Sequence, residues 1–194
     1  MTGGDNGREP WQNRFVMRQL LLLRHAKSAW DDATMPDRDR PLNARGRRAV
    51  AVMREAMRDL GLVPDVVLVS TSRRTQETLE LLEPWDEAPL IEPMDSLYLA
   101  NPIQLMAALH GVAETVRSVL LIGHNPGLHD LAVSLAGPLA MASGSEATRA
   151  LAAGFPTGAL AEFVVARSWW ELREGGARLV RFLTPRSLEA AGQS

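Results

Sequence analysis

The stretch Gln19-Leu-Leu-Leu-Leu-Arg24, with His25 directly after it, decides the fold of this chain. It is a short and almost continuous apolar run, which is typical of a strand buried on both faces. The same character recurs twice, in Val66-Val-Leu-Val-Ser70 and in Ser118-Val-Leu-Leu-Ile-Gly123. Strands of this kind belong to parallel sheets that helices cover on both sides, so the three runs predict the centre of such a sheet.

Helical segments separate these strands. The stretch from Asn43 to Leu60 repeats apolar residues at helical spacing, with Asn43 as its N-cap and Gly61 just beyond its end. Further helices are predicted at 74–82, 102–110 and 125–135, and shorter strands at 90–91, 159–166 and 178–183. The last two strands form a predicted antiparallel pair around Glu174-Gly-Gly176. This alternation of strands and helices predicts an α/β fold with a largely parallel central sheet.

Length and composition indicate one folded domain. The chain has 194 residues, 46% of them hydrophobic, which is enough for a single core. We predict this domain at residues 18–185, with a flexible N-terminal tail at 1–17 and a C-terminal tail at 186–194. The first tail is polar and glycine-rich, it has no apolar run of signal-peptide length, and Met17 is an alternative start.

Charge and cysteine content argue against several classes of function. A formal net charge of −2 argues against a general nucleic-acid binder and against a polybasic membrane anchor. The absence of cysteine excludes disulfides, thiolate catalysis and cysteine-ligated zinc, and it is compatible with the reducing cytoplasm, where we expect the protein. The apolar runs are also too short to cross a bilayer, so a membrane is not an expected partner. Nucleic acid is not an expected partner either, because of the net charge.

Polar residues suited to an anion follow each of the three strands. In open α/β sheets, ligands bind beyond the carboxyl ends of the strands, which share one edge of the sheet. The residues at these ends are Arg24-His25 after the first strand, Ser70 with Arg73 and Arg74 after the second, and Gly123-His124-Asn125 after the third. Two histidines and two or three arginines are therefore predicted to converge on one site.

This combination suits the handling of a phosphoryl group. Arginine holds phosphate oxygens in a bidentate way and keeps its charge at every physiological pH. A histidine can attack phosphorus and form a covalent intermediate that water then hydrolyses. The helix predicted to begin at Asn125-Pro126 adds free N–H groups beside His124, and these favour an anion. The sequence contains no nucleophile elbow, Walker-A loop or GxGxxG motif that would indicate a different chemistry.

The same residues also have structural interpretations. His124 could be a hydrogen-bonded residue of its turn, and Arg73-Arg74 could begin a solvated helix, although a cation in the first turn opposes the helix dipole. Their joint occurrence at three successive strand ends favours the functional interpretation, without deciding between the two arginines. His110 and His129 lie within predicted helices, where packing is the expected role. No regular set of carboxylates accompanies the histidines, as a metal site would require.

Five motifs carry a resemblance to a known family. The first is Leu22-Leu-Arg-His-Ala-Lys-Ser-Ala-Trp30, and the others are Asp39-Arg-Pro-Leu-Asn-Ala-Arg-Gly46, Val69-Ser-Thr-Ser-Arg-Arg-Thr-Gln-Glu-Thr78, Leu97-Tyr-Leu-Ala100 and Leu121-Ile-Gly-His-Asn-Pro-Gly127. Through them the chain resembles the histidine phosphatase superfamily, and within it the SixA-type phosphohistidine phosphatases, over residues 18 to about 166. The resemblance implies a phosphoglycerate mutase-like three-layer α/β/α sandwich, with a mostly parallel central sheet and an antiparallel edge strand.

The resemblance also implies a role for each residue of the predicted site. His25 is the implied nucleophile, and His124 is the second histidine, which holds the phosphoryl group and stabilises the transition state. In the motif that runs from Val69 to Thr78, the family's phosphate-binding arginine lies four residues after the serine. Counted from Ser70, the resemblance therefore selects Arg74 over Arg73 as a phosphate ligand. The implied phosphate-binding residues are Arg24, Arg74, Ser28 and Asn125.

The general acid is less well defined by the motifs. The chain has Ala26 and Lys27 where many relatives have glycine and glutamate, although SixA-like chains share both residues. Larger relatives place a glutamate between the second and third strand-end motifs, and here that interval holds Glu92 and Asp95. We predict Asp95 as the catalytic acid; the alternatives after the nucleophile are Asp31, Asp32, Asp37 and Asp39. A leaving imidazole, which is easily expelled, needs no strong acid.

Together these features predict a metal-independent phosphatase that forms a covalent phosphohistidine. No cofactor is expected, because the arginines replace Mg²⁺, and the short loops favour a phosphohistidine on a protein over an enclosed small phosphorylated substrate. The alternatives are a small-molecule phosphomonoesterase, a phosphoglycerate mutase-like enzyme and a non-catalytic phosphate-binding domain. The sequence shows no extra basic cluster that a mutase would need, and the intact pair His25 and His124 argues against a binding domain.

Overall fold

A computed structural model of the chain describes residues 17–142 and 144–192. Its single sheet contains β1 (Arg18–Arg24), β2 (Val66–Ser70), β3 (Leu90–Met94), β4 (Ser118–Gly123), β5 (Leu160–Val165) and β6 (Ala177–Leu183). The helices are α1 (Ala44–Asp59), α2 (Arg73–Leu82), α3 (Pro102–His110), α4 (Gly127–Ala142), α5 (Glu146–Ala153) and α6 (Pro185–Ala191). Three short 3₁₀ helices are η1 (Asp37–Asp39), η2 (Asp95–Leu97) and η3 (Trp169–Glu171).

The sheet has the strand order β3-β2-β4-β1-β5-β6. Strands β1 to β4 run parallel to one another, whereas β5 is antiparallel to both β1 and β6. The predicted α/β fold with a mostly parallel sheet is confirmed. The predicted antiparallel edge is present as well, because β6 forms the edge of the sheet and pairs antiparallel with β5.

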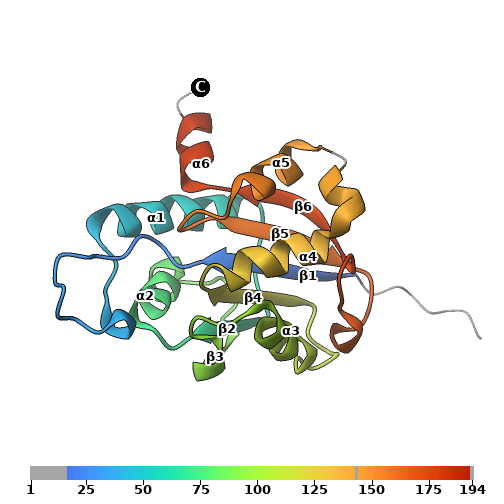
Figure 1. Cartoon of the computed structure of the whole chain (residues 1–194), viewed down its shortest axis with the longest axis horizontal. Coiled ribbons are helices and arrows are strands. Elements are labelled where there is room, and N and C mark those ends of the chain that lie inside the picture. Colours follow the sequence, from blue (N-terminus) through green and yellow to red (C-terminus); the bar gives the residue numbers. More distant parts are fainter. Residues whose placement is uncertain (1–16, 143, 193–194) are drawn as a thin grey trace, which may run out of the picture.

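Helices cover both faces of the sheet and enclose two apolar cores. Leu21 and Leu23 of β1 point into a core shared with α1 and α2, and Leu188 of α6 packs against it. Leu20 and Leu22, which alternate with them, point into the other core, shared with α3, α4 and α5. Figure 1 shows α3 and α4 crossing in front of the strands. The unbroken apolar run of β1 thus has its predicted cause, burial on both faces.

The helix ends follow the predicted caps closely. The side chain of Asn43 accepts a hydrogen bond from the N–H of Gly46, and the side chain of Asn101 accepts one from the N–H of Gln104. Helix α4 begins two residues later than predicted, at Gly127. A β-carbon at Gly127 would stand 1.9 Å from the carbonyl oxygen of Ala100, so only glycine allows this close approach.

Gly46 permits a second close approach, beside the predicted nucleophile. A β-carbon at this position would lie 2.2 Å from the carbonyl oxygen of Lys27. The first turn of α1 therefore rests directly on the backbone that follows His25. The N–H of Asn43 donates to the same Lys27 carbonyl at 3.0 Å, which ties the start of the helix to the loop.

The C-terminal tail predicted from residue 186 is instead helical through Ala191. Thr184 caps this helix, with its hydroxyl accepting from the N–H of Ser187, and Pro185 occupies the first helical position. The sequence predicts a tail here because the segment lacks a long apolar pattern, although its capping residues are typical of a helix start. The predicted N-terminal tail, apart from Met17, lies outside the described residues. Of the helices described, none is long and apolar enough to cross a bilayer.

Candidate active site

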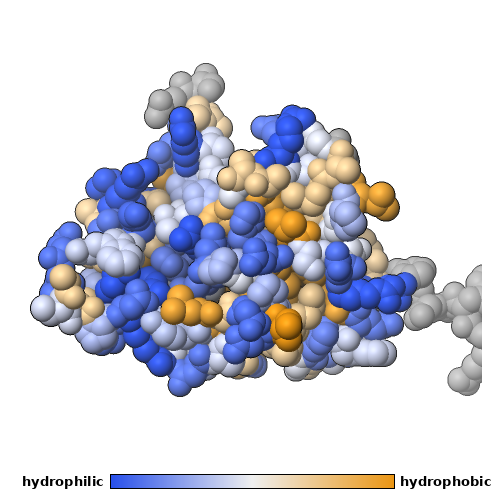
Figure 2. All heavy atoms as spheres, viewed as in Figure 1, coloured by the Kyte–Doolittle hydropathy of each residue, from blue (hydrophilic) through white to orange (hydrophobic). Residues whose placement is uncertain are grey.

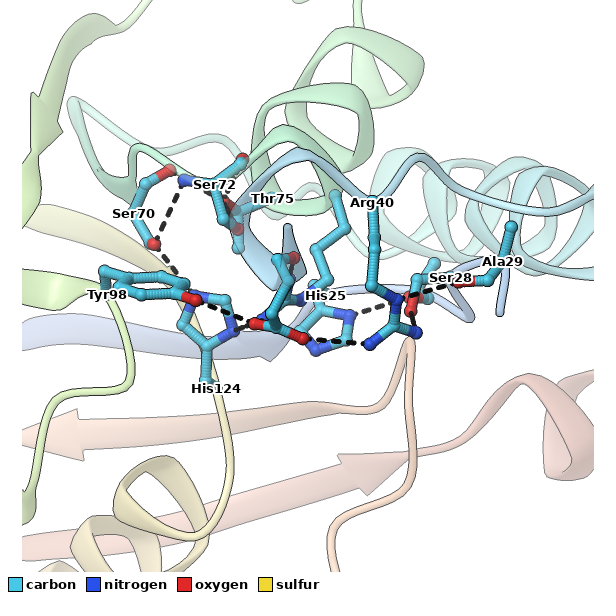
Figure 3. A network of polar contacts seen from close by, with 12 residues as sticks. His25, Ser28, Ala29, Arg40, Ser70, Ser72, Thr75, Tyr98 and His124 are labelled. Carbon is cyan, nitrogen blue, oxygen red and sulfur yellow. Dashed lines mark hydrogen bonds and ion pairs between the residues drawn. The ribbon is translucent and has the colours of Figure 1, made fainter. Parts of the chain in front are cut away.

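The two predicted active-site histidines lie side by side at the carboxyl edge of the sheet. His25 follows β1 and His124 follows β4, and these strands pair in parallel with Arg24 opposite Gly123. The ring centroids are 5.1 Å apart, and both residues are buried. Figure 3 shows the two imidazoles close together, with Tyr98 on the side of His124 and Arg40 on the side of His25. Parallel pairing thus joins residues that are far apart in the chain.

The hydrogen bond made by His25 determines which ring nitrogen is free. Its Nδ1 lies 2.7 Å from the carbonyl oxygen of Ala26, and because a carbonyl only accepts, Nδ1 carries the hydrogen. Neutral His25 therefore keeps a lone pair on Nε2. Burial lowers the pKa of His25 to about 4; the bond to Ala26 opposes this shift, and the positive charge of Arg74 adds to it. At neutral pH the ring is therefore uncharged, and the lone pair of Nε2 is available.

His124 has a complementary arrangement. Its Nε2 lies 2.8 Å from the hydroxyl oxygen of Ser70, and its Nδ1 is 3.4 Å from Nη2 of Arg74. Since arginine only donates, Nδ1 holds the lone pair and the Nε2–H donates to Ser70. Burial, together with the neighbouring His25 and Arg74, lowers the pKa of His124 to about 3. Ser70, fully buried, thus fixes the ring plane of His124.

We predict that both active-site histidines stay neutral in the folded protein until the pH falls well below 6. Burial lowers the pKa of His25 to about 4 and that of His124 to about 3, whereas an unperturbed histidine titrates near 6.5. NMR titration of the ring C–H signals from pH 8 to 3.5 checks this. The same protein unfolded in urea is the control, in which every histidine should titrate at about 6.5. A folded-state midpoint near 6.5 for either ring would contradict the prediction.

The same shifts make folding stability depend on pH. Because the unfolded chain binds protons at these two sites more readily, the free energy of unfolding is highest above about pH 6.5. It should decline as the pH falls from there toward the folded-state pKa values, about 4 for His25 and about 3 for His124. Urea unfolding at pH 7 and pH 5 measures this decline.

The structure distinguishes the two neighbouring arginines at the start of α2. Arg74 points inward with a side chain 4% exposed, whereas the Arg73 side chain is 53% exposed and pairs with Glu77. Arg74 contacts His124 through Nη2 and also donates to Asp37. Arg74 therefore belongs to the site and Arg73 lies on the surface.

Arg24 approaches the site from the end of β1. Its Nη1 donates to the carbonyl oxygen of Phe155 at 2.8 Å, and its buried Nε has no hydrogen-bond partner in the described part of the chain. Burial lowers the pKa of Arg24, and the nearby positive charge of Arg74 acts in the same direction. A partly buried guanidinium with an unused donor is suited to an incoming anion.

Three residues of the site were not singled out from the sequence. Arg40 is buried and donates to Ser28 Oγ at 2.7 Å and to Asp37 Oδ1 at 2.9 Å. Tyr98 donates its hydroxyl to Asp37 Oδ2 at 2.7 Å. Arg40 and Tyr98 lie inside the quoted motifs, and Asp37 was only one of several candidate acids, so the signal was present without an assigned role.

Ser28 and Asn125 reach the neighbourhood of the site by different routes. Ser28 is buried and accepts the hydrogen bond from Arg40, which leaves its own hydroxyl hydrogen available. The Asn125 amide donates to the Phe155 carbonyl at 2.9 Å, the same oxygen that Arg24 contacts. Asn125 thereby helps to hold the loop that anchors Arg24.

The candidate acids other than Asp37 lie at or outside the rim of the site. The carboxylate of Asp95 contacts Arg38 and Thr71 and is 76% exposed, and these hydrogen bonds lower its pKa. Glu92 is exposed on the edge strand β3. Asp31, Asp32 and Asp39 are exposed in the loop after β1. None of the contacts of Asp95 is with His25 or His124.

The chemistry available at this site is therefore anion binding next to a neutral nucleophile. Arg24, Arg40 and Arg74 surround His25 closely enough for their charges to lower its pKa, after the larger effect of burial. Within residues 17–142 and 144–192, no three histidine, aspartate or glutamate side chains gather as metal ligands would. The arrangement suits the transfer of a phosphoryl group to Nε2 of His25.

Comparison with known proteins places this site in a family context. A sequence model of the Histidine phosphatase superfamily (branch 1) matches residues 20–93. An uncharacterized protein of Mycobacterium tuberculosis is 35% identical over 166 residues, which cover 84% of this chain and 100% of the relative.

Two solved structures are similar over nearly their whole length. The first, assigned as the phosphohistidine phosphatase SixA from Nakamurella multipartitia, is 27% identical, with a TM-score of 0.76, 87% of this chain covered and 96% of the other. The second, assigned as SixA from Agrobacterium tumefaciens, is 30% identical, with a TM-score of 0.71 and coverage of 87% and 98%.

Proposed function

Because this chain belongs to the histidine phosphatase superfamily and is a phosphatase, we propose that it acts through a covalent phosphohistidine on His25 and hydrolyses phosphohistidine in proteins. One observation carries the proposal. The bond from Nδ1 of His25 to the Ala26 carbonyl leaves Nε2 as a free, uncharged nucleophile among three arginines.

In the first step, the lone pair of His25 Nε2 attacks phosphorus, and the bond from phosphorus to the leaving group breaks. Arg24 and Arg74 neutralise the phosphoryl oxygens. A dianion beside Nδ1 of His124 favours a proton on that nitrogen, so this ring then donates to an oxygen as well. In the second step, water attacks phosphorus, the bond to Nε2 breaks, and inorganic phosphate leaves with His25 restored.

The protonation states of the carboxylates favour a nitrogen leaving group. Hydrogen bonds hold the pKa of Asp95 below its usual range and that of Asp37 at about 2, so both are ionised at neutral pH. An alkoxide leaving group needs a proton donor, which these carboxylates do not supply. A phosphohistidine protonated on its other ring nitrogen leaves as neutral imidazole without such a donor. We therefore assign no general acid, in place of the predicted Asp95.

The surroundings of the site support a protein substrate. Trp30 is 71% exposed and stacks on Arg40, whose Cζ lies 3.2 Å from the ring centroid. Lys27 is exposed close to His25, and the Arg38 side chain is 44% exposed. Figure 2 shows hydrophilic residues over the part of the molecule where Figure 1 places α1, α2 and the loop after β1. A protruding phosphohistidine can reach a site whose rim is exposed in this way.

Phosphate release by the wild type tests the proposed function. The assay compares a phosphohistidine peptide with p-nitrophenyl phosphate, each with and without EDTA. We expect release from the peptide that EDTA does not reduce, because arginines supply the charge that Mg²⁺ provides elsewhere. Faster release from the ester would favour a small-molecule phosphomonoesterase. Loss of activity in EDTA would contradict metal independence, and no release from either substrate would contradict the proposed function.

A further inference from the structure

Asp37 joins the parts of the site that bind the phosphoryl group. Its carboxylate accepts from Nη2 of Arg74 at 2.9 Å, from Nη1 of Arg40 at 2.9 Å and from the Tyr98 hydroxyl at 2.7 Å. Its main-chain carbonyl accepts from the other terminal nitrogen of Arg74 at 2.5 Å. Asp37 therefore accepts hydrogen bonds from both terminal nitrogens of Arg74 and from one terminal nitrogen of Arg40.

These contacts limit the directions in which the two arginines can point. Both guanidiniums are buried, so their hydrogen bonds are made to protein groups. Nη2 of Arg74 faces the Asp37 carboxylate on one side and Nδ1 of His124 on the other. Arg40 is held between Asp37 and Ser28, next to His25. Without the Asp37 carboxylate, the guanidiniums of Arg74 and Arg40 would be two buried positive charges with no neutralising group beside them.

We propose that Asp37 is the positioning residue that aims Arg74 and Arg40 at the transferred phosphoryl group, an inference that rests on the proposed function. It acts through the arginines, and it transfers no proton. Arg24, Arg40 and Arg74 against this one carboxylate leave two positive charges in excess, which match a phosphoryl dianion. Asp37 thus sets both the geometry and the charge of the pocket.

The alternative role of a general acid makes a different prediction about leaving groups. An acid is needed far more for an alkyl ester, whose alkoxide is a poor leaving group, than for a protonated phosphohistidine or for p-nitrophenyl phosphate. A residue that only aims arginines affects both reactions equally, since the same phosphoryl group is transferred in each. The pKa of Asp37, lowered to about 2 by the bonds from Tyr98 and Arg74 against the opposing effect of burial, supports the positioning role.

Steady-state kinetics of Asp37→Asn test this proposal, with Asp39→Asn as the matched control. Asp39 lies two residues away in the same 3₁₀ helix and is exposed. For Asp37→Asn we expect kcat to fall about 10- to 100-fold on the phosphohistidine peptide and by the same factor on any turnover of an alkyl phosphate such as glycerol phosphate, as misdirected catalytic groups do. KM should change less than kcat. Asp39→Asn should stay within about twofold of wild type.

Two further variants guard against loss of folding as an explanation. Asp37→Glu keeps the carboxylate and should recover part of the lost kcat. Tyr98→Phe removes one of the bonds to Asp37 and should lower kcat by a smaller factor. Near-UV circular dichroism of each variant must match the wild type. Wild-type kcat in folded Asp37→Asn, or a loss confined to the ester, overturns the proposal. A wild type inactive on both substrates overturns the proposed function and this inference with it.

Discussion

His25→Ala is expected to lower turnover of a phosphohistidine peptide by at least about 10⁴-fold, because it removes the proposed nucleophile, Nε2 of the imidazole. The wild-type ring is prepared for this attack, with Nδ1 bonded to Ala26 and Nε2 free. Alanine leaves the arginines in place, so phosphate binding should survive. The intermediate is detected as label transferred from the substrate's phosphoryl group to the protein. After rapid quenching, acid-stable label is separated from base-stable label. An acid-labile phosphoenzyme should form in the wild type alone.

His110→Gln is the matched control for this substitution. His110 lies on α3, where its Nε2 contacts the Leu172 carbonyl at 2.8 Å, away from the strand ends that carry the site. Its turnover should stay within about twofold of wild type. If His25→Ala keeps more than a few per cent of wild-type turnover, the covalent mechanism is wrong. If the variant is inactive but still incorporates the label, the nucleophile is another residue.

Arg74→Ala should lower kcat/KM about 10²- to 10³-fold, the usual cost of losing one preorganised donor at a developing charge. Its guanidinium is buried and contacts both His124 and Asp37, so the deletion removes a positive charge at the centre of the site. Steady-state kinetics on the phosphohistidine peptide measure the loss. Arg74→Lys should recover only part of it, because an ammonium group lacks the planar fork that contacts two oxygens at once.

The adjacent residue provides the control. Arg73→Ala makes the same chemical change one position earlier, where the side chain is 53% exposed and bonded to Glu77. This variant should retain kcat/KM within about threefold, since a surface ion pair contributes little. Equal losses for the two variants would show that the positive charge of the helix start matters, and that the direction of Arg74 does not.

Most of the fold was predictable from local patterns in the sequence. The three buried strands have unbroken apolar runs, and the caps Asn43 and Asn101 precede helices with apolar residues at helical spacing. These signals are strong because each strand and helix needs them to bury its own surface. The order of the strands made it possible to predict that His25 and His124 share one edge of the sheet, where the structure places both.

Weaker local signals led to the differences. Helix α6 is short and mostly exposed, so the capping residues around Thr184 are its main signature. The start of α4 at Gly127 is set by the close approach of that glycine to the carbonyl oxygen of Ala100. Composition and periodicity do not distinguish such choices, because the energy that decides them comes from contacts between distant segments.

The sequence by itself determined the layered fold, the caps of its main helices and the strand-end position of Arg24, His25 and His124, because apolar periodicity and chain order are properties of neighbouring residues. Only the tertiary structure decided how the side chains meet. It left Nε2 of His25 free, and it brought Asp37, in a short 3₁₀ helix of the segment after β1, to the guanidiniums of Arg74 and Arg40. Those outcomes depend on packing angles and hydrogen bonds across the fold, which no local pattern encodes.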